Sequence, residues 1–263
     1  MHFLPLNTLC KSPRADCGRK SATLNTNAQP TIIAMDGPAA SGKSTIGLAL
    51  AQRLGYLFFD TGIMYRAVTW AAVARGIDVR DAAGAGALAK TLDIDILPPG
   101  NATDGRHSTV LVDGVDVTWE LRSSAVEQHV SAVSAHADVR AALTQQQRQI
   151  GLRNSAGSAE RPGIVMVGRD IGTAVLPEAP LKIYLDASPM ERARRRHAEL
   201  AARGRDVSIE HIHADILARD AYDSSRAVAP LRPAADAIHI DTTGLSPEAV
   251  VARILTLVYA AGT

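Results

Sequence analysis

The stretch TIIAMDGPAASGKSTIGLALAQRL, from Thr31 to Leu54, decides how the rest of the chain is interpreted. Its centre, GPAASGKS from Gly37 to Ser44, matches the G-x-x-x-x-G-K-[ST] pattern of a phosphate-binding loop. The apolar residues before the loop are typical of a strand buried on both faces, and those after it recur at the spacing of one helix face. Because strand, loop and helix follow in the required order, the stretch predicts a nucleoside triphosphate site.

Phosphate chemistry explains the residue types in this loop. Gly37 and Gly42 allow backbone conformations that are closed to other residues, and the start of the following helix adds the positive end of its dipole. We expect Lys43 to reach the outer phosphates and the Ser44 hydroxyl to bind Mg²⁺. A glycine-rich turn that carries a lysine by chance is the alternative, and the flanking strand and helix argue against it.

The composition is that of an ordinary globular protein. Of the 263 residues 46% are hydrophobic and 21% charged, and the net charge of +1 does not favour a nucleic-acid partner. No stretch approaches the roughly 20 continuous apolar residues of a membrane span, so no membrane partner is expected. The two cysteines, Cys10 and Cys17, lie within residues 1–30, which we interpret as a disordered extension. Two free thiols and no disulfide framework favour a cytoplasmic location.

Further strand and helix patterns alternate along the chain. With the strand before Gly37, the runs 56–60, 163–167, 181–186 and 237–241 give five expected strands. The fold class is therefore α/β, an open five-stranded parallel sheet with helices on both faces. Between residues 92 and 118 an alternating pattern with a hairpin signal at Asp113-Gly114 predicts a small antiparallel insertion. Residues 123–152 are predicted to be helical.

Polar residues follow several of the expected strands. Thr61 and Arg66 could bind a second phosphate, or they could be a helix cap and a surface arginine, and the pattern does not choose between these. Arg169 and Asp170 lie on a glycine-flanked turn where open α/β sheets bind ligands, although an internal ion pair is the alternative. Charged and polar residues of the helical stretch are expected at the surface, namely Ser131, Arg140 and Arg148.

Two charge-rich helices are expected after the strand 181–186. The first begins at the capping sequence from Ser188 to Glu191, and a glycine, Gly204, separates it from the second. Such helices are usually solvated surfaces, but beside a phosphate site they also describe a mobile lid that brings arginines to a transferring phosphoryl group.

The order and spacing of five segments resemble the bacterial cytidylate kinases, a family of P-loop nucleoside monophosphate kinases. The segments are GPAASGKST, DTGIMYR, GRDIGT, KIYLDAS and RDAYDSSRAVAPL, and the likeness covers roughly residues 31–261. It implies transfer of the γ-phosphoryl group of ATP to CMP or dCMP, with Mg²⁺, by a cytoplasmic monomer of pyrimidine metabolism. It also implies one domain over 31–263, with a core (31–85, 161–196, 227–263), an acceptor-binding insertion (about 86–160) and a lid (about 197–226).

The same resemblance assigns individual residues. The implied ATP-binding set is Gly37, Pro38, Ala39, Ala40, Ser41, Gly42, Lys43, Ser44 and Thr45. The implied CMP-binding set is Thr61, Arg66, Ser131, Arg140, Arg169, Asp170, Arg219, Asp223 and Arg226. Within it, Asp170, Ser131 and Arg140 would face the cytosine ring and Arg219 and Asp223 the sugar, so the resemblance alone moves Ser131 and Arg140 into the site. The implied catalytic residues are Lys43, Arg66, Arg169, Arg226, Arg195 and Arg196.

The chain departs from the family at Val167, where many members carry an acidic residue before the GRD sequence. Asp36 would then be the nearest substitute for a role in Mg²⁺ binding. Two other functions are weighed against the resemblance. A P-loop kinase could act on UMP or another small acceptor, or the chain could be an ATP- or GTP-binding regulatory module, although no N-K-x-D guanine-reading motif is present.

Overall fold

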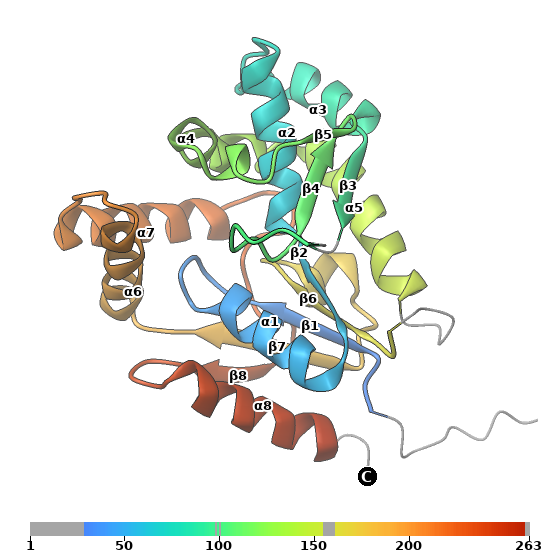
Figure 1. Cartoon of the computed structure of the whole chain (residues 1–263), viewed down its shortest axis with the longest axis vertical. Coiled ribbons are helices and arrows are strands. Elements are labelled where there is room, and N and C mark those ends of the chain that lie inside the picture. The colour runs from blue at the N-terminus through green and yellow to red at the C-terminus, as the bar shows by residue number, and fades with distance from the viewer. Residues whose placement is uncertain (1–28, 98, 100, 155–160, 261–263) are drawn as a thin grey trace, which may run out of the picture.

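The computed structural model describes residues 29–97, 99, 101–154 and 161–260 (Figure 1). The extension predicted over residues 1–30 lies outside the described residues except for its last two positions, and so do both cysteines. Five strands form the central sheet: β1 (Ile32–Asp36), β2 (Leu57–Asp60), β6 (Ile164–Val167), β7 (Leu181–Asp186) and β8 (Ile238–Asp241). Their order is β2-β6-β1-β7-β8, and every neighbouring pair is parallel, which confirms the predicted sheet.

The register of the sheet determines where the loops begin. Met35 of β1 pairs with Val167 of β6 on one side and with Ile183 of β7 on the other. Asp60 of β2 also pairs with Val167. The loops that follow these strands therefore start at one edge of the sheet, which is the edge where open α/β folds bind ligands.

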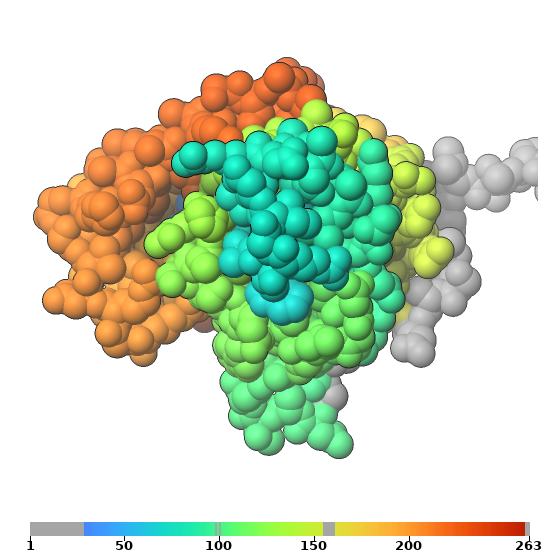
Figure 2. Space-filling model, turned by 90° about the horizontal axis from the view of Figure 1, so that it is seen from above, coloured from blue at the N-terminus to red at the C-terminus, as the bar shows by residue number. Residues whose placement is uncertain are grey.

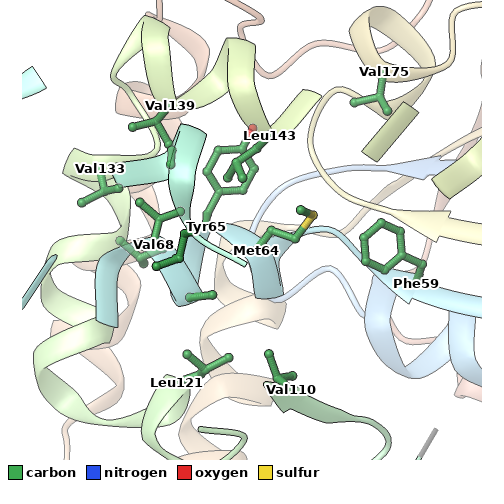
Figure 3. Packing of buried hydrophobic residues seen from close by; sticks show 14 of the residues in the cluster. Phe59, Met64, Tyr65, Val68, Val110, Leu121, Val133, Val139, Leu143 and Val175 are labelled. Atoms are coloured by element: carbon green, nitrogen blue, oxygen red, sulfur yellow. The ribbon is translucent and has the colours of Figure 1, made fainter. Parts of the chain in front are cut away.

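Both faces of the sheet are covered by helices, because successive residues of its inner strands β1 and β6 are apolar and buried. Ile33 and Met35 pack in the cluster that includes α1 (Lys43–Leu54) and α8 (Pro247–Ala260). Ile32 and Ala34 pack on the opposite face, where α2 (Gly62–Ala74), α3 (Ala82–Thr91) and α5 (Ala137–Arg153) lie. Figure 3 shows side chains of α2, β2 and α5 in this second cluster.

A second, small sheet belongs to the insertion. Its strands are β3 (Ile94–Leu97), β4 (Thr109–Val112) and β5 (Val115–Asp116), and they pair antiparallel in that order. Asp113 and Gly114 both have positive φ angles, 49° and 78°, as the predicted two-residue hairpin requires. The 3₁₀ turn η1 (Glu120–Arg122) then leads to α4 (Ser124–Val133).

The stretch 123–152, predicted to be helical, forms two separate helices, so the prediction of one continuous helix was wrong. The chain leaves the helical conformation between Val133 and Ala137, and His136 precedes α5 with an extended backbone, φ −67° and ψ 124°. The imidazole of His136 makes a 2.8 Å hydrogen bond with the carbonyl oxygen of Val79. The break is thus stabilised by a contact with a distant segment, and no glycine or proline marks it in the sequence.

The helices α6 (Pro189–Ala202) and α7 (Ile209–Ser224) pack on each other through Ala193, Leu200, Ile212 and Ile216. Ser188 caps α6 by accepting a hydrogen bond from the N–H of Glu191, as predicted. Gly204 lies between the helices with φ +71°. Figures 1 and 2 show this helix pair beside the insertion, and Figure 2 shows a recess between them. Among the described residues, no helix is long and apolar enough to cross a membrane.

Candidate active site

The phosphate-binding loop follows β1 at the edge where the loops of the sheet meet. Gly37 has φ +148°, and a Cβ atom there would lie 2.0 Å from the carbonyl oxygen of Leu185, so no other residue fits. Gly42, with φ +92°, precedes α1. The Lys43 ammonium group donates to the carbonyl oxygen of Pro38 and to the hydroxyl of Ser41. Burial lowers the pKa of Lys43 well below its ordinary value, and the charge of Arg169 lowers it further.

An oxygen pair at the start of α1 suits a divalent cation. The exposed hydroxyl of Ser44 donates to Oδ2 of Asp60 at 2.7 Å, and Oδ1 of the same carboxylate accepts from the N–H of Gly62. Magnesium binds through one or two carboxylates together with substrate phosphates, so Ser44 and Asp60 fit such an ion. Within the described ranges, no group of three or more histidine, cysteine, aspartate or glutamate residues forms an all-protein metal site.

Asp36, which the sequence suggested as a substitute in Mg²⁺ binding, contacts the turn after β6, and its role toward Mg²⁺ stays a prediction. Its two oxygens accept hydrogen bonds from the N–H groups of Ile171 and Gly172, at 2.7 and 2.8 Å. The carboxylate that lies against Ser44 is that of Asp60, which the sequence analysis did not single out.

Asp170 forms a buried ion pair with an arginine from the insertion. Nη2 of Arg140 lies 2.5 Å from Oδ2 of Asp170, and the two side chains are only 3% and 6% exposed. Nη1 of Arg140 donates to the carbonyl oxygen of Ser134. The surface position predicted for Arg140 from the sequence pattern was therefore wrong, whereas Arg148 is indeed at the surface, paired with Glu178. Ser131 is half-buried one turn before Ser134, whose hydroxyl donates to the Ser131 carbonyl.

A second buried carboxylate, Asp223 of α7, forms ion pairs with two more of the arginines predicted for the site. It accepts from Nε of Arg169 at 3.2 Å and from Nη2 of Arg226, and Arg226 also donates to the Ser134 hydroxyl at 2.9 Å. Arg219 is close enough to this group that Arg169 and Arg226 affect it electrostatically, and burial lowers the pKa of Arg219 to about 10. The turn after β6, the break between α4 and α5, and α7 therefore meet at one cluster of charges.

This acceptor cluster, as we call Arg140, Arg169, Asp170, Arg219, Asp223 and Arg226, carries more positive than negative charge. Four guanidinium groups face two carboxylates, which leaves two positive charges unmatched. The buried Nε atoms of Arg140, Arg219 and Arg226 have no hydrogen-bond partner among the described residues. Unmatched charge and unused donors at a buried position are what a dianionic ligand would satisfy.

Thr61 and Arg66 lie at the start of α2. The Thr61 hydroxyl donates to the carbonyl oxygen of Val167 at 2.9 Å and does not cap the helix, so that alternative is excluded for Thr61. Nη1 of Arg66 donates to the carbonyl oxygen of Leu121, and burial lowers the pKa of Arg66. Arg66 is thus not a freely solvated arginine. Its electrostatic neighbours include Asp60 and Glu127.

The predicted lid arginines occupy different surroundings. Arg195 donates to the backbone and side-chain oxygens of Thr242, and the Thr242 hydroxyl is 3.5 Å from the carbonyl oxygen of Ser41 in the phosphate-binding loop. Arg196 reaches across to the insertion, where Nη2 donates to Glu127 of α4 at 2.6 Å. Arg195 therefore lies at the donor loop, and Arg196 is engaged by a carboxylate.

Sequence reasoning did not assign a role to Arg192, although it contacts the phosphate-binding loop. Arg192 is buried, donates to the carbonyl oxygen of Ala39 at 3.2 Å, and pairs with Asp220 of α7 at 2.6 Å. Helix periodicity does not single it out, because Arg196 lies closer than Arg192 to the face of α6 that carries Ala193 and Leu200.

The family model described as cytidylate kinase matches residues 33–260 of the chain. A cytidylate kinase of Roseiflexus castenholzii is 54% identical over 226 residues, which cover 86% of this chain and 92% of that protein. A cytidylate kinase of Herpetosiphon aurantiacus is 51% identical over 229 residues, covering 87% and 94%. A bifunctional pantoate ligase/cytidylate kinase of a Synechococcus species is 47% identical over 227 residues, which cover 86% of this chain and 42% of that protein. With its P-loop, its parallel sheet and this extent of identity, the chain belongs to the cytidylate kinase family of nucleoside monophosphate kinases.

Proposed function

We propose that the protein transfers the γ-phosphoryl group of ATP to CMP or dCMP, giving ADP and CDP or dCDP. The observation that carries the proposal is the surplus of two positive charges in the acceptor cluster, at the same edge of the sheet as the phosphate-binding loop. A nucleoside monophosphate brings a phosphate of about two negative charges, which would neutralise this surplus. Family membership supports the same acceptor.

The donor side of the reaction rests on residues 37–45. Backbone N–H groups of the loop and the start of α1 would hold the ATP phosphates, and Lys43 would exchange the Pro38 carbonyl for a phosphate oxygen. Ser44 and Asp60 would hold Mg²⁺, which when bound neutralises charge on the outer phosphates of ATP. Phosphoryl transfer then depends on alignment and charge stabilisation and needs no covalent nucleophile from the protein.

The acceptor side rests on arginines that are already paired. Arg66, Arg169 and Arg226, with the Thr61 hydroxyl, would bind the CMP phosphate, and Arg219 with Asp223 would lie near the sugar. Two polyanions repel each other, so several cations are needed to hold them in line. Arg195 and Arg196 would stabilise charge that develops between the two substrates.

Asp170 gives the proposed preference for cytosine, together with Ser131 and Arg140. A carboxylate accepts a hydrogen bond from the exocyclic amine of cytosine, whereas uracil presents an oxygen at the same place and would be repelled. The mismatch leaves a buried polar group unpaired, and this is worth roughly 1 to 3 kcal/mol. Arg140 holds the Asp170 side chain in place by pairing with Oδ2.

We also infer a division of the chain that fits these roles. Residues 31–85, 161–196 and 227–263 would form the core, about 86–160 the acceptor-binding insertion, and about 197–226 the lid. Residues 155–160 and 261–263 of these ranges lie outside the described part of the chain. Glu127 also pairs with Arg205 of the lid, and Arg196, at the boundary of core and lid, would have to leave Glu127 to reach the phosphates, so lid movement is part of the proposal. A cytoplasmic monomer acting in pyrimidine nucleotide metabolism is the setting we expect.

A coupled assay of ADP release tests the function, with CMP, dCMP, UMP and AMP supplied in turn as the acceptor. We expect CMP and dCMP to be used best, and Asp170→Ala to impair CMP use far more than ATP binding. Glu178→Ala is the matched control. Glu178 pairs at the surface with Arg148 of α5, the helix that also carries Arg140, the partner of Asp170. ADP release that does not depend on any acceptor would favour a regulatory ATPase module. A preference for another acceptor would favour a different P-loop kinase.

A further inference from the structure

Asp36 joins two loops that the sequence separates by more than a hundred residues. It ends β1, directly before the phosphate-binding loop, and is 4% exposed. Its Oδ1 accepts from the N–H of Ile171 at 2.7 Å and its Oδ2 from the N–H of Gly172 at 2.8 Å. These two residues begin the π-helical turn η2 (Ile171–Val175), immediately after Arg169 and Asp170. One carboxylate therefore holds both backbone donors of the turn that carries the acceptor-binding residues.

The packing around this contact allows little freedom. A Cβ atom on Gly172 would lie 3.1 Å from Cδ of Lys182 and 3.4 Å from Oδ2 of Asp36, so the turn lies close against the end of β1. On the other side, Gly37 is packed against the carbonyl oxygen of Leu185. The donor loop and the acceptor turn are thus both fixed within a few ångströms of the Asp36 carboxylate.

Opposing effects act on the pKa of the buried Asp36 carboxyl group. Burial raises the pKa of Asp36 to about 6, and the nearby charge of Asp170 adds to this effect, while the two N–H bonds and Lys43 oppose it. At neutral pH the group is nevertheless ionised. A carboxylate supplies two acceptor oxygens and no donor, and among the residues of its size only aspartate does so. Asparagine would be the neutral alternative, and it would satisfy one of the two N–H groups.

We propose that Asp36 is a positioning residue that keeps the acceptor turn, residues 168–173, in register with the phosphate-binding loop. This inference rests on the proposed function, in which residues 37–45 hold the donor and Arg169 and Asp170 hold the acceptor. In-line transfer requires the reacting atoms to be held at about 3 to 3.5 Å, and a shift of about 1 Å lowers the rate about a hundredfold. Asp36 does not touch either substrate in this account. It acts through the backbone of Ile171 and Gly172.

The isosteric variant Asp36→Asn tests the proposal. The carboxamide keeps the shape of the side chain, but its NH₂ group opposes one of the two N–H donors, so one hydrogen bond is lost. We expect kcat/KM for CMP to fall by about 10- to 100-fold. We expect the Kd of ATP measured without acceptor to change by less than about twofold, since the donor loop keeps its own contacts. Equal losses for ATP and CMP, or no loss at all, would overturn the proposal.

Asp81→Asn is the matched control. Asp81 also accepts a backbone N–H bond, from Ala83 at the start of α3, but it is exposed and, among the described residues, makes no contact with the acceptor turn. We expect its kcat and both KM values to match those of the unchanged protein. A loss in this variant equal to that of Asp36→Asn would show that the effect is not specific to the acceptor turn, and would overturn the proposal.

Amide hydrogen exchange gives a readout that does not depend on the identity of the acceptor. In the ligand-free protein, the amides of Ile171 and Gly172 should be protected like those of β6, and Asp36→Asn should speed their exchange while leaving the β3–β4 pairing unchanged. If CMP proves not to be the substrate, the proposed function fails and this measurement still decides the role of Asp36. If the variant does not fold, the unchanged protein suffices, because exchange of both amides at the rate of an exposed loop would overturn the proposal.

Discussion

The buried ion pair between Arg140 and Asp170 should have a much larger coupling energy in unfolding than an exposed ion pair made by the same helix. Arg140 and Arg148 both lie on α5, and each pairs with a carboxylate in the segment that follows β6. The side chains of Arg140 and Asp170 are 3% and 6% exposed, whereas those of Arg148 and Glu178 are 41% and 44% exposed. The two pairs therefore differ mainly in solvent access.

The expected magnitudes follow from this difference. Asp170→Leu alone leaves the Arg140 charge buried without its partner, which should reduce the free energy of unfolding by about 3 to 5 kcal/mol. Arg140→Met alone should have a similar effect, and it also removes the hydrogen bond to the Ser134 carbonyl, worth about 1 kcal/mol. Replacing both leaves no uncompensated charge, so the double variant should be much more stable than the sum of the single effects predicts. We expect a coupling energy of roughly 3 kcal/mol.

The assay is urea unfolding of the ligand-free protein, followed by circular dichroism, for each variant of the two cycles. For Arg148 and Glu178 we expect a coupling of about 0.2 to 1 kcal/mol, which should weaken further in salt because the pair is exposed. The coupling of Arg140 and Asp170 should persist in salt. If both cycles give the same small coupling, the interior of the acceptor cluster is open to water, and the argument from unmatched buried charge fails.

Three further predictions concern the packing, the donor loop and pH. Gly47→Ala should destabilise the protein by about 1 to 3 kcal/mol, because the added methyl group would lie 2.7 Å from Cγ1 of Val167 and 3.1 Å from the Phe58 ring, and unchanged urea unfolding would contradict this packing. Lys43→Met should lower kcat by about 10²- to 10³-fold in the ADP-release assay, while Lys90→Met, an exposed position on α3, should leave it unchanged. Because the pKa of Asp36 is raised from 3.8 to about 6 on folding, its contribution to stability should fall as pH rises from about 4 to 7, by about 3 kcal/mol. Comparison of the unfolding free energies of Asp36→Asn and the unchanged protein across this range measures that fall, and parallel pH profiles would contradict it.

The parts of the fold that sequence predicts well depend on local patterns. The strand before Gly37 and the helix after it follow from apolar periodicity, and Asp113-Gly114 supports its hairpin through two positive φ angles. The parallel order of the sheet follows from alternation of strands and helices, since a parallel connection needs a crossover. These features need no knowledge of distant contacts.

The burial of the acceptor cluster depends on distant contacts, and sequence patterns do not predict it. Arg140 lies in a helix with a long polar run, where a charged residue is normally solvated, and only Asp170 from another segment explains its position. Gln147, in the same polar run, is 1% exposed, although glutamine is usually found at the surface. The break at residues 134–136 is stabilised by the carbonyl of Val79, and the Asp36 contact spans 135 residues of chain. Family resemblance moved Arg140 away from the surface because it carries spatial information that periodicity lacks.

The partners of the arginines suggest how the ligand-free protein tolerates so much positive charge near the phosphate-binding loop. Arg169 and Arg226 share Asp223, while Arg196 and Arg205 share Glu127 of α4. A phosphate that enters therefore competes with carboxylates for guanidinium groups that are already oriented. The free energy gained on binding is the difference between the guanidinium–phosphate and the guanidinium–carboxylate interaction. It is therefore smaller than the strength of either pair suggests. A dianion gains more from this exchange than a monoanion, and we therefore expect the acceptor cluster to favour a phosphate monoester over a carboxylate of similar size.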